Sequence, residues 1–531
     1  MQKVFSALII VCCLQANSQK LVSMKYGSML QPDGLRKDLS VLASPEMEGR
    51  ETGKPGQRRA AAYIESRMKE IGLTPPTSLN GYQQYYNLLR DSLIKASFSW
   101  NTYVAGYGDD FIMPVAQNNS ADIRADRAIF LGYGIMDKLY NDYSNISRID
   151  NSIAIILTGE PKSNGRYLLT GTDKPSEWTS LGLQKKLEMA HFMGASAVIV
   201  INPGQESFSE RSIEHSRKSN RFPKNTNDAP VINHLQISHA TARKIMTTEF
   251  ADSIIREGQG FKPFVRTEEE ITTGSFSLPC RIEMKKQTDT IKPSNVMGVL
   301  EGSDKKDEYV FLTAHYDHLG VQDGKIYYGA DDDGSGTAAI LQIAEIFSKA
   351  RADGNGPSRS LVFMAVSGEE KGLLGSEYYS NNPIFPLEKT SVDLNIDMIG
   401  RIDTERKLPD TNNYVYLIGH DKMSSELNDI SIKSNASCCG MTLDYKFDDP
   451  KDPNRIFFRS DHYNFAKKGV PILFYYDGML KADYHKPTDT IDKINWELFA
   501  KRTRLVFHTA WEIAGKQNML TRDLPLPAMT R

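Results

Sequence analysis

The chain has 531 residues, of which 40% are apolar and 24% charged, and its formal net charge is −2. This composition allows large buried cores and lacks the mark of disordered chains, so it predicts a globular protein with more than one domain. The balanced charge gives no reason to expect nucleic acid as a partner.

Residues 1–18 have the composition of a secretory signal peptide. Lys3 precedes an apolar run over residues 4–14, and small residues around Ser18 suit cleavage, so the mature chain is expected to begin near Gln19. The apolar run is shorter than the roughly 20 residues that span a bilayer. The sequence therefore predicts an exported protein, periplasmic or extracellular, with no membrane attachment after the signal is removed.

Three cysteines follow the signal, which is too few for a disulfide scaffold and odd in number. Cys438 and Cys439 are adjacent and could form a vicinal disulfide, either could pair with Cys280, or all three could be free thiols. Cys12 and Cys13 lie in the segment to be removed, and a lipoprotein is a minor alternative.

The segment after the signal predicts two helical stretches. Apolar residues recur at helical spacing over 58–71 and Gly72 supplies a stop, while residues 38–42 form a shorter helical turn. Between them lies the glycine-rich segment 47–56. We interpret it as a connector, with a site-facing loop as the alternative.

The pattern of predicted elements changes between residues 98 and 272. Strand candidates at 152–157 and 197–202 surround a helix at 181–193, and polar stretches separate them. His191 on this helix has no partner at ligand spacing, so no function is assigned to it. This pattern predicts an inserted domain. The expected division is 1–18 signal peptide, 19–95 first segment of the main domain, 96–272 inserted domain, and 273–520 main segment.

From about residue 279 onward, strands and helices alternate. Strands are expected at 309–314, 360–366 and 392–397, with helices at 336–350 and 372–379 between them. This alternation predicts an α/β fold with a mixed, largely parallel sheet sandwiched by helices. Ligands of such sheets gather beyond the carboxyl ends of the strands.

Two motifs place candidate metal ligands at such strand ends. His315 ends the first strand, and Asp317 follows as the natural partner for its second ring nitrogen. Asp332 lies in the segment Gly329-Ala330-Asp331-Asp332-Asp333-Gly334-Ser335-Gly336, directly ahead of an apolar helix. Helix capping would explain part of this segment, but three acids and three glycines exceed what a cap requires. A carboxylate there can bridge two cations, and we assign that role to Asp332.

Three further motifs complete the set. Glu369 and Glu370 follow a buried strand and face different directions, so one can bind metal while the other faces water. Asp397 ends another apolar stretch, and Tyr484-His485 follows the strand 471–476. Two imidazoles and three carboxylates suit zinc, with manganese or cobalt as alternatives.

The order of these motifs resembles the co-catalytic zinc aminopeptidase family, which includes secreted bacterial leucyl-type aminopeptidases, glutamate carboxypeptidase and animal glutaminyl cyclases. Shared features are an H-x-D, an aspartate in a glycine-rich acidic segment, a G-E-E, a later aspartate and a final Y-H. The segment Gly49-Arg50-x-x-Gly53 also fits, and the inserted region resembles a protease-associated domain. The segment Asp331-Asp332-Asp333-Gly334 departs slightly, since relatives often carry asparagine or alanine there; this leaves the bridging assignment intact but blurs it by one residue.

The resemblance implies two zinc ions and a peptide substrate. One ion would be held by His315 and Asp397, the other by Glu370 and His485, with Asp332 bridging. The remaining roles would fall to Glu369 as general base, Tyr484 in polarising the carbonyl, and Asp317 in orienting His315.

Three alternatives accompany the expected aminopeptidase. A carboxypeptidase of the same family would need an arginine for the terminal carboxylate, and Arg459 is a candidate, although a structural salt bridge is the favoured interpretation. A glutaminyl cyclase and a non-catalytic peptide-binding protein are less favoured, because the chain has an insertion and a full ligand set. Side-chain specificity and oligomeric state are not readable from the sequence.

Overall fold

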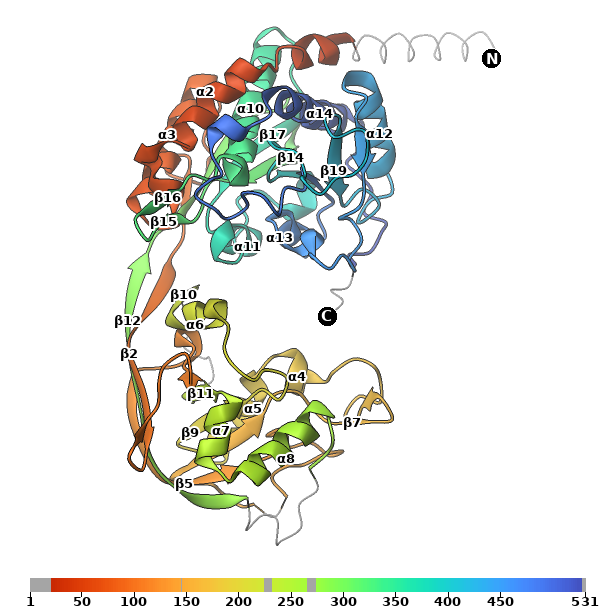
Figure 1. The fold of residues 1–531 in the computed structure, drawn as a ribbon. Helices are drawn as coiled ribbons and strands as arrows, with labels where there is room; N and C mark the ends of the chain where they lie inside the picture. Colours follow the sequence, from red (N-terminus) through yellow and green to blue (C-terminus); the bar gives the residue numbers. More distant parts are fainter. Residues whose placement is uncertain (1–20, 145, 224–231, 265–273, 528–531) are drawn as a thin grey trace. The chain divides into compact units, whose positions relative to one another are not determined.

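A computed structural model of the protein describes residues 21–144, 146–223, 232–264 and 274–527. The chain divides into two compact units, the described parts of 1–86 and 292–531 forming unit 1 and those of 87–291 forming unit 2 (Figure 1). The predicted signal peptide, 1–18, lies outside the described residues. Within the described ranges, the helices are all too short or too polar to cross a membrane.

Unit 1 is built on an eight-stranded sheet with the order β1-β13-β17-β14-β18-β21-β19-β20. Its central strands β17, β14, β18 and β21 are parallel, whereas β13 runs antiparallel to β17 and β19 runs antiparallel to β21. This arrangement confirms the predicted α/β class. The strands are β1 (Gln83–Tyr85), β13 (Ser294–Leu300), β14 (Lys305–His315), β17 (Arg359–Val366), β18 (Thr390–Ile396), β19 (Tyr414–Ile418), β20 (Thr442–Asp444) and β21 (Ile472–Tyr476), with a separate hairpin of β15 (Gly320–Gln322) and β16 (Lys325–Tyr327).

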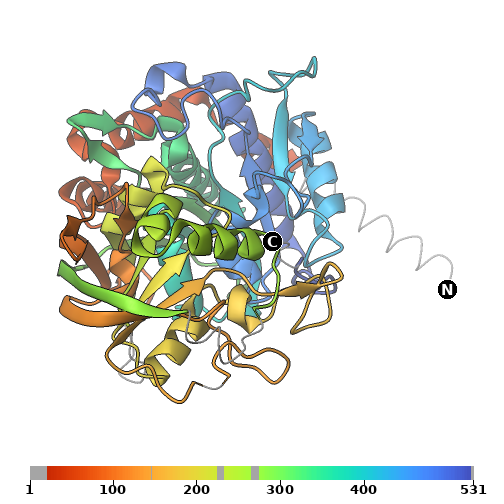
Figure 2. The same cartoon turned by 60° about the horizontal axis from the view of Figure 1, so that its bottom comes forward.

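Helices cover both faces of this sheet (Figure 1 and Figure 2). Val310 and Leu312 of β14 point into the core under α10 and α14, while Phe311 between them packs with Tyr379 of α11 and Phe465 of α13. The alternation explains why the central strands are apolar at successive positions. The helices are α2 (Pro32–Leu42), α3 (Pro55–Ile71), α10 (Gly336–Ala352), α11 (Leu374–Asn381), α12 (Leu427–Cys438), α13 (His462–Ala466) and α14 (Trp496–Gly515); the short helical turns are η1 (Pro45–Arg50), η3 (Ala330–Ser335), η4 (Glu369–Lys371), η5 (Leu387–Lys389), η6 (Ile456–Phe458) and η7 (Ile491–Lys493).

Unit 2 has a nine-stranded sheet of its own, in which eight strands follow the order β10-β2-β12-β5-β6-β9-β11-β4 and the ninth, β3, pairs with β2. Strands β5, β6, β9 and β11 are parallel, and helices α7 and α8 share a core with one face while α5 packs on the other. The strands are β2 (Leu88–Trp100), β3 (Tyr103–Val104), β4 (Phe111–Ile112), β5 (Ala121–Phe130), β6 (Ser152–Leu157), β7 (Lys162–Ser163), β8 (Arg166–Tyr167), β9 (Ala197–Ile201), β10 (Lys218–Arg221), β11 (His234–Ile237) and β12 (Ser275–Ile291); the helices are α4 (Glu177–Ser180), α5 (Gln184–Phe192), α6 (Glu210–Arg217), α7 (His239–Ile245) and α8 (Thr248–Gln259), with the turn η2 (Val115–Gln117).

The junctions of unit 2 lie at the ends of its two longest strands. β2 and β12 pair antiparallel from Leu88 with Ile291 to Trp100 with Cys280. The first boundary expected from the sequence, after residue 95, falls inside β2, and the second, after residue 272, lies outside the described residues. The unit begins earlier than expected because β2 enters the sheet as soon as the chain leaves unit 1.

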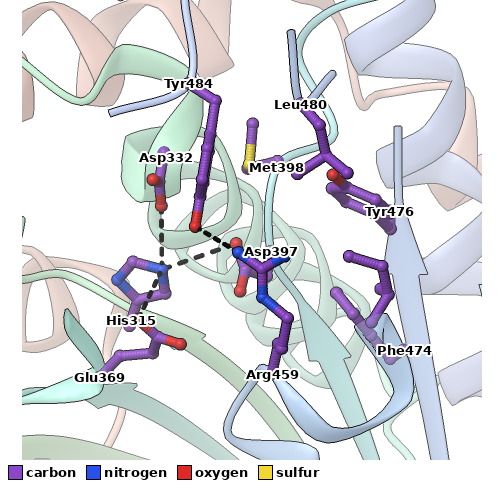
Figure 3. A pocket seen from close by; sticks show the side chains of 11 residues that line it. His315, Asp332, Glu369, Asp397, Met398, Arg459, Phe474, Tyr476, Leu480 and Tyr484 are labelled. Carbon is purple, nitrogen blue, oxygen red and sulfur yellow. Dashed lines mark hydrogen bonds and ion pairs between the residues drawn. The ribbon is translucent and has the colours of Figure 1, made fainter. Parts of the chain in front are cut away.

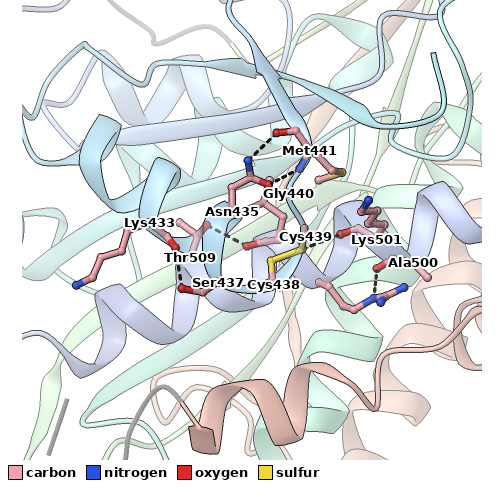
Figure 4. Close-up of a disulfide and its surroundings, with 12 residues drawn as sticks. Lys433, Asn435, Ser437, Cys438, Cys439, Gly440, Met441, Ala500, Lys501 and Thr509 are labelled. Carbon is pink, nitrogen blue, oxygen red and sulfur yellow. Dashed lines mark hydrogen bonds between the residues drawn. A yellow bond between two sulfur atoms is a disulfide. The ribbon is translucent and has the colours of Figure 1, made fainter. Parts of the chain in front are cut away.

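The cysteines of unit 1 form a vicinal disulfide (Figure 4). Cys438 is bonded to Cys439 at the end of α12, where the amides of Cys439 and Gly440 donate to the carbonyl of Asn435. Cys280 in unit 2 is a buried free thiol, and its burial raises its pKa to about 11. Of the pairings left open by the sequence, the adjacent one is present.

Candidate metal centre

The candidate ligands come from five chain segments at the carboxyl edge of the unit 1 sheet. His315 is the last residue of β14, and Asp397 directly follows β18. Glu370 lies in η4 just after β17, Asp332 in η3 ahead of α10, and His485 in the loop after β21. Since the carboxyl ends of parallel strands meet at one edge, residues far apart in sequence converge here.

The structure brings these five side chains together around the carboxylate of Asp332. Its Oδ1 lies 3.2 Å from Nε2 of His315, and its Oδ2 lies 3.2 Å from Nε2 of His485. His315 Nε2 is also 3.5 Å from Oδ1 of Asp397, and His485 Nε2 is 3.1 Å from Oε2 of Glu370. Two groups of ligand atoms therefore share one carboxylate, each oxygen facing a different imidazole.

Local contacts explain why Asp332, and not its neighbours, faces the histidines. Asp333 caps α10 by accepting the amide of Gly336, and the same oxygen accepts the amide of Met398. Asp331 accepts the amide of Gly400. Both flanking acids thus bind backbone in the loop after β18. This geometry supports Asp332 over its neighbours for the bridging position.

The donor set fits a pair of zinc ions. Ligands 2.0–2.1 Å from a tetrahedral zinc lie about 3.3 Å from one another. The four ligand-to-ligand distances, two to Asp332 and one each from His315 to Asp397 and from His485 to Glu370, lie between 3.1 and 3.5 Å and agree with this spacing. His315 and Asp332 are 1% and 3% exposed, so their charges need a partner within the protein.

A pocket opens beside these ligands (Figure 3). Its polar side carries His315, Asp332, Asp397 and Glu369, whose Oε2 lies 3.9 Å from Nε2 of His315. The apolar wall is formed by Met398, Ile456, Phe474, Tyr476 and Leu480. The pocket therefore joins the candidate centre to a site for an apolar group.

Tyr484 and Arg459 lie together at the pocket (Figure 3). Nη2 of Arg459 donates to the hydroxyl of Tyr484 at 2.9 Å, and the Tyr484 ring stacks on His485 with ring centroids 3.9 Å apart. In the part of the chain that the structure describes, no carboxylate forms a salt bridge with Arg459. The favoured interpretation of Arg459 as a salt-bridge residue is therefore wrong, and its hydrogen-bond partners are the hydroxyl of Tyr484 and the carbonyl of Asn454, which lies 3.4 Å from Nη1.

Residues 295–510, which contain all five candidate ligands, match the profile of Peptidase family M28. This part of the chain is therefore similar to peptidase family M28. A probable leucine aminopeptidase of Trichophyton verrucosum is 27% identical over 314 residues, which cover 57% of this chain and 82% of the relative. Aminopeptidase Y of Saccharomyces cerevisiae is 28% identical over 240 residues, which cover 43% and 40%.

The solved structure of an aminopeptidase from Aneurinibacillus sp. strain AM-1 has the same fold. Its TM-score is 0.56 at 16% sequence identity, and the match covers 95% of this chain and 97% of that one. The match extends beyond the 295–510 region, so the shared fold includes parts of the chain outside the M28 profile.

Within the M28 site, Asp317 holds His315 differently from the sequence prediction. Nδ1 of His315 bonds to the backbone carbonyl of Asp317 at 3.0 Å, not to its carboxylate. The carboxylate instead accepts the hydroxyl of Thr52 at 2.6 Å and the amide of Glu369 at 3.2 Å. Asp317 thus connects His315 with the segment carrying Glu369.

The interpretation of segment 47–56 as a plain connector is wrong, because it carries a buried arginine. Arg50 is fully buried and donates to the carbonyls of Tyr316, Leu42, Tyr328 and Gly329 at 2.6–2.8 Å. These carbonyls belong to α2, to the loop after His315 and to the loop before Asp332. The motif Gly49-Arg50-x-x-Gly53, which the family resemblance includes, was the signal that could have found it.

Asp489 is a second site residue that the sequence did not single out. Its carboxylate accepts the amides of Asp331 and Asp332 at 3.1–3.2 Å. It therefore fixes the backbone that carries the central carboxylate. Its only sequence signal is its place four residues after His485.

The charges of the acids dominate the protonation of the M28 site. Although burial opposes a charge on His485, Asp332 and Glu370 raise its pKa to about 10. Burial likewise opposes a charge on His315, yet Asp397 and Glu369 raise its pKa well above the usual value. Positive charge is favoured here, as expected of a centre that holds cations.

Two further clusters combine histidine with acids. His318 lies with Asp332 and Glu370 at the M28 site. His420, Asp421 and Asp448 lie elsewhere in unit 1, where Nζ of Lys422 is 3.0 Å from Asp448. The lysine supplies the positive charge in the second cluster, so it needs no metal ion.

Proposed function

We propose that this protein is a metallo-aminopeptidase that hydrolyses the N-terminal peptide bond of peptides with two zinc ions and Glu369 as general base. The observation that carries the proposal is the Asp332 carboxylate, whose oxygens face imidazoles of two separate ligand groups while Glu369 faces the pocket beside them. The similarity of the 295–510 region to peptidase family M28 and the aminopeptidase relatives support the same conclusion.

The two ions would be held by different residues. His315 and Asp397 would bind one, Glu370 and His485 the other, and Asp332 would bridge them. Manganese or cobalt would fit the same nitrogen and oxygen donors. When bound, such a pair acidifies a water molecule and stabilises negative charge on the peptide carbonyl oxygen.

Glu369 has the environment of a general base. Burial raises the pKa of its carboxyl well above the usual value for glutamate, which brings it closer to the working pH. The amide of Glu369 donates to Asp317, which fixes the backbone beneath the carboxylate. Glu369 would accept a proton from the attacking water and return it to the leaving amine.

Tyr484 would donate a hydrogen bond to the substrate carbonyl. Burial, together with Asp332 and Glu370, raises the pKa of Tyr484 well above the usual value for tyrosine, so its hydroxyl stays protonated. Since Arg459 already donates to the oxygen of this hydroxyl, the proton of Tyr484 remains free to point elsewhere.

The named relatives favour an aminopeptidase over a carboxypeptidase. The carboxylates that line the pocket, Asp332, Glu369 and Asp397, are assigned to the metal ions and to proton transfer. Arg459, the candidate partner of a terminal carboxylate, instead donates to the hydroxyl of Tyr484. The apolar wall of the pocket would accept an apolar side chain of the N-terminal residue.

We further propose that the protein acts outside the cytoplasm and that unit 2 is a protease-associated-like insertion. Residues 1–18 have the pattern of an export signal. The Cys438–Cys439 disulfide agrees with an oxidising compartment. For unit 2, its own core and parallel strands support a separately folded insertion.

Purified protein tests the activity directly. Aminoacyl-p-nitroanilides with apolar and charged side chains, matched peptides with blocked amino ends, and N-terminal glutamine peptides would be assayed with chelator and after zinc is restored. We expect chelator-sensitive release of apolar residues from free amino ends only. Cleavage of blocked peptides from their carboxyl end would support a carboxypeptidase, ammonia release from the glutamine peptides a cyclase, and metal content near zero would contradict the proposal.

A further inference from the structure

We propose that His318 is a positioning residue that holds one oxygen of Glu370 and thereby aims the other oxygen at the metal position shared with His485. The inference rests on the proposed function, because Glu370 is a ligand only in that proposal. It assigns a role to a histidine outside the expected ligand set.

The two oxygens of Glu370 face two different imidazoles. Oε1 lies 2.8 Å from Nδ1 of His318, and Oε2 lies 3.1 Å from Nε2 of His485. Within the described residues, neither Oε1 of Glu370 nor Nδ1 of His318 has a partner with the full geometry of a hydrogen bond, so their 2.8 Å approach is an ion-pair contact.

The distances distinguish a positioning role from direct ligation. A contact of 2.8 Å is typical of a charge-assisted hydrogen bond and shorter than the ~3.3 Å between two ligands of a tetrahedral zinc. His318 Nδ1 is also 3.7 Å from Oδ2 of Asp332, whereas His485 is 3.2 Å from the same atom. His318 is thus close to one oxygen of one ligand, while His485 is equally close to two ligands.

The surroundings of His318 hold its ring in place. The side chain is fully buried, and the backbone amide of His318 donates to the carbonyl of Arg50. A Cβ on Gly329 would lie 2.5 Å from Cγ of His318, so only glycine allows the loop to press against the ring. Gly329 also has a positive φ of 55°. The imidazole cannot rotate away from Glu370 without moving this loop.

The Glu370 carboxylate, held in this way, loses less conformational freedom when a zinc ion binds. Residues that hydrogen-bond to metal ligands typically contribute 10–100-fold to metal affinity. Because His318 contacts Glu370 and not Asp397, its effect should fall on one of the two ions. The ion at His315 and Asp397 should be bound with nearly unchanged affinity.

Two substitutions of His318 by residues of similar size distinguish a positioning role from direct ligation of zinc. In His318→Asn the amide nitrogen takes the place of Nδ1 and can still donate to Glu370, whereas His318→Leu removes the donor. His234→Leu is the control, since His234 in unit 2 is also fully buried with no hydrogen-bond partner for its ring nitrogens among the described residues. Stepwise zinc affinities would be measured on full-length metal-free protein by competition with a chelator, with circular dichroism as a folding check.

We expect His318→Leu to weaken one of two zinc-binding steps by about 10–100-fold, while His318→Asn and His234→Leu stay within about threefold of the unaltered protein. Two unchanged zinc affinities in His318→Leu would overturn the inference. Equal losses of zinc affinity in the Asn and Leu variants would overturn it in favour of direct ligation. Zinc X-ray absorption spectra that show three imidazole ligands per two zinc ions would do the same. If His318→Leu fails to fold, His318→Gln replaces it, because its amide nitrogen takes the place of Nε2 and cannot reach Oε1. Unaltered protein that binds fewer than two zinc ions would instead contradict the proposed function.

Discussion

Glu369 and Glu370 are neighbours in the chain but lie in different environments. Glu370 is enclosed by His318 and His485, while Glu369 lines the pocket. Glu369→Gln keeps the shape of the side chain and removes its capacity to accept a proton. We expect turnover to fall by roughly 10²–10⁴-fold with both zinc ions retained, measured by steady-state kinetics and metal analysis. The control is Glu388→Gln, which changes an exposed glutamate and should leave turnover and zinc content as in the unaltered protein. Near-normal turnover in Glu369→Gln would remove Glu369 as the base.

His485 is predicted to affect metal content as well as activity. It is the more exposed of the two candidate histidine ligands, with 36% of its side chain accessible, so its loss should disturb folding little. We expect His485→Ala to bind one zinc normally and to lose the second during dialysis, with activity lost in parallel. His191→Ala, an exposed histidine of α5, is the matched control. Two tightly bound zinc ions in His485→Ala would contradict its assignment as a ligand.

At the scale of elements, Arg50 joins η1 to two loops that carry candidate ligands. Four carbonyls lose their donor in Arg50→Met, and the nearby acids Asp489, Asp317 and Asp332 lose a buried positive charge. Removing one partner from a buried charge network costs about 3–5 kcal/mol. We expect the free energy of unfolding to fall by this amount, measured by denaturant titration, and zinc binding to weaken with it.

Arg59→Met is the control for this prediction. Arg59 of α3 forms a surface ion pair with Glu48 of η1, and the side chain of Arg59 is 43% exposed. Its loss should change the free energy of unfolding by no more than about 0.5 kcal/mol. Similar values for Arg50→Met and Arg59→Met would show that Arg50 does not hold the two loops.

Helix α13 carries a histidine that makes unit 1 sensitive to acid. Burial lowers the pKa of His462 from 6.5 to about 4, and its Nε2 bonds to the carbonyl of Phe457 at 2.8 Å. Between these two pKa values the unfolded chain binds a proton that the folded chain does not. Stability should therefore be unaffected above pH 6.5, fall as the pH decreases, and level off below pH 4.

His462→Gln keeps a donor at the position of Nε2 and cannot titrate. Protonation of His462 alone should lower the free energy of unfolding by about 2.5 kcal/mol between pH 7 and pH 4.5. The free energy of unfolding of the variant should lack this decrease. Free energies of unfolding of metal-free protein at the two pH values check this, with His191→Gln as an exposed control. An equal pH dependence in His462→Gln and the unaltered protein would show that His462 is protonated equally in both states.

The elements that the sequence predicts well are those with unbroken apolar runs. β17 is buried at all of its positions, and its predicted range of 360–366 differs from Arg359–Val366 by one residue. The short strands β1 and β20 are missed, because three residues do not distinguish a strand from a loop. The strands β13 and β19 are also missed, although each is buried at all of its positions. Fold class depends on the long central elements, and these carry the clearest patterns.

The same division applies to the candidate site. Acids and histidines that end apolar strands are recognisable, because their positions follow from the topology of the sheet. Arg50 and Asp489 are not, since their contacts depend on approach between distant segments: Arg50 binds the carbonyl of Tyr316, 266 residues later. The contact of His318 with Glu370 likewise depends on the packing of Gly329, which spacing along the chain does not reveal.

For the whole molecule, the candidate site belongs entirely to unit 1. Its ligands lie between His315 and His485, and unit 2, Asn87–Ile291, is inserted between Tyr86 and Lys292. The two chain ends of unit 1 at the insertion lie side by side, because the amide of Tyr86 donates to the carbonyl of Pro293 at 3.1 Å and β1 pairs with β13. The chain of unit 1 can therefore be joined directly at this point without the insertion.

Removal of unit 2 tests whether the proposed centre is complete in unit 1. Residues 88–291 would be replaced by Gly-Gly, a length that suits a tight turn between adjacent antiparallel segments. Because unit 1 has its own sheet and core, we expect a folded protein that binds two zinc ions and cleaves small aminoacyl anilides within about tenfold of the full chain. Metal analysis and kinetics measure this, and Glu369→Gln in the shortened chain should abolish the activity that remains. A shortened protein that folds and binds two zinc ions but cleaves nothing would show that unit 2 contributes to catalysis itself.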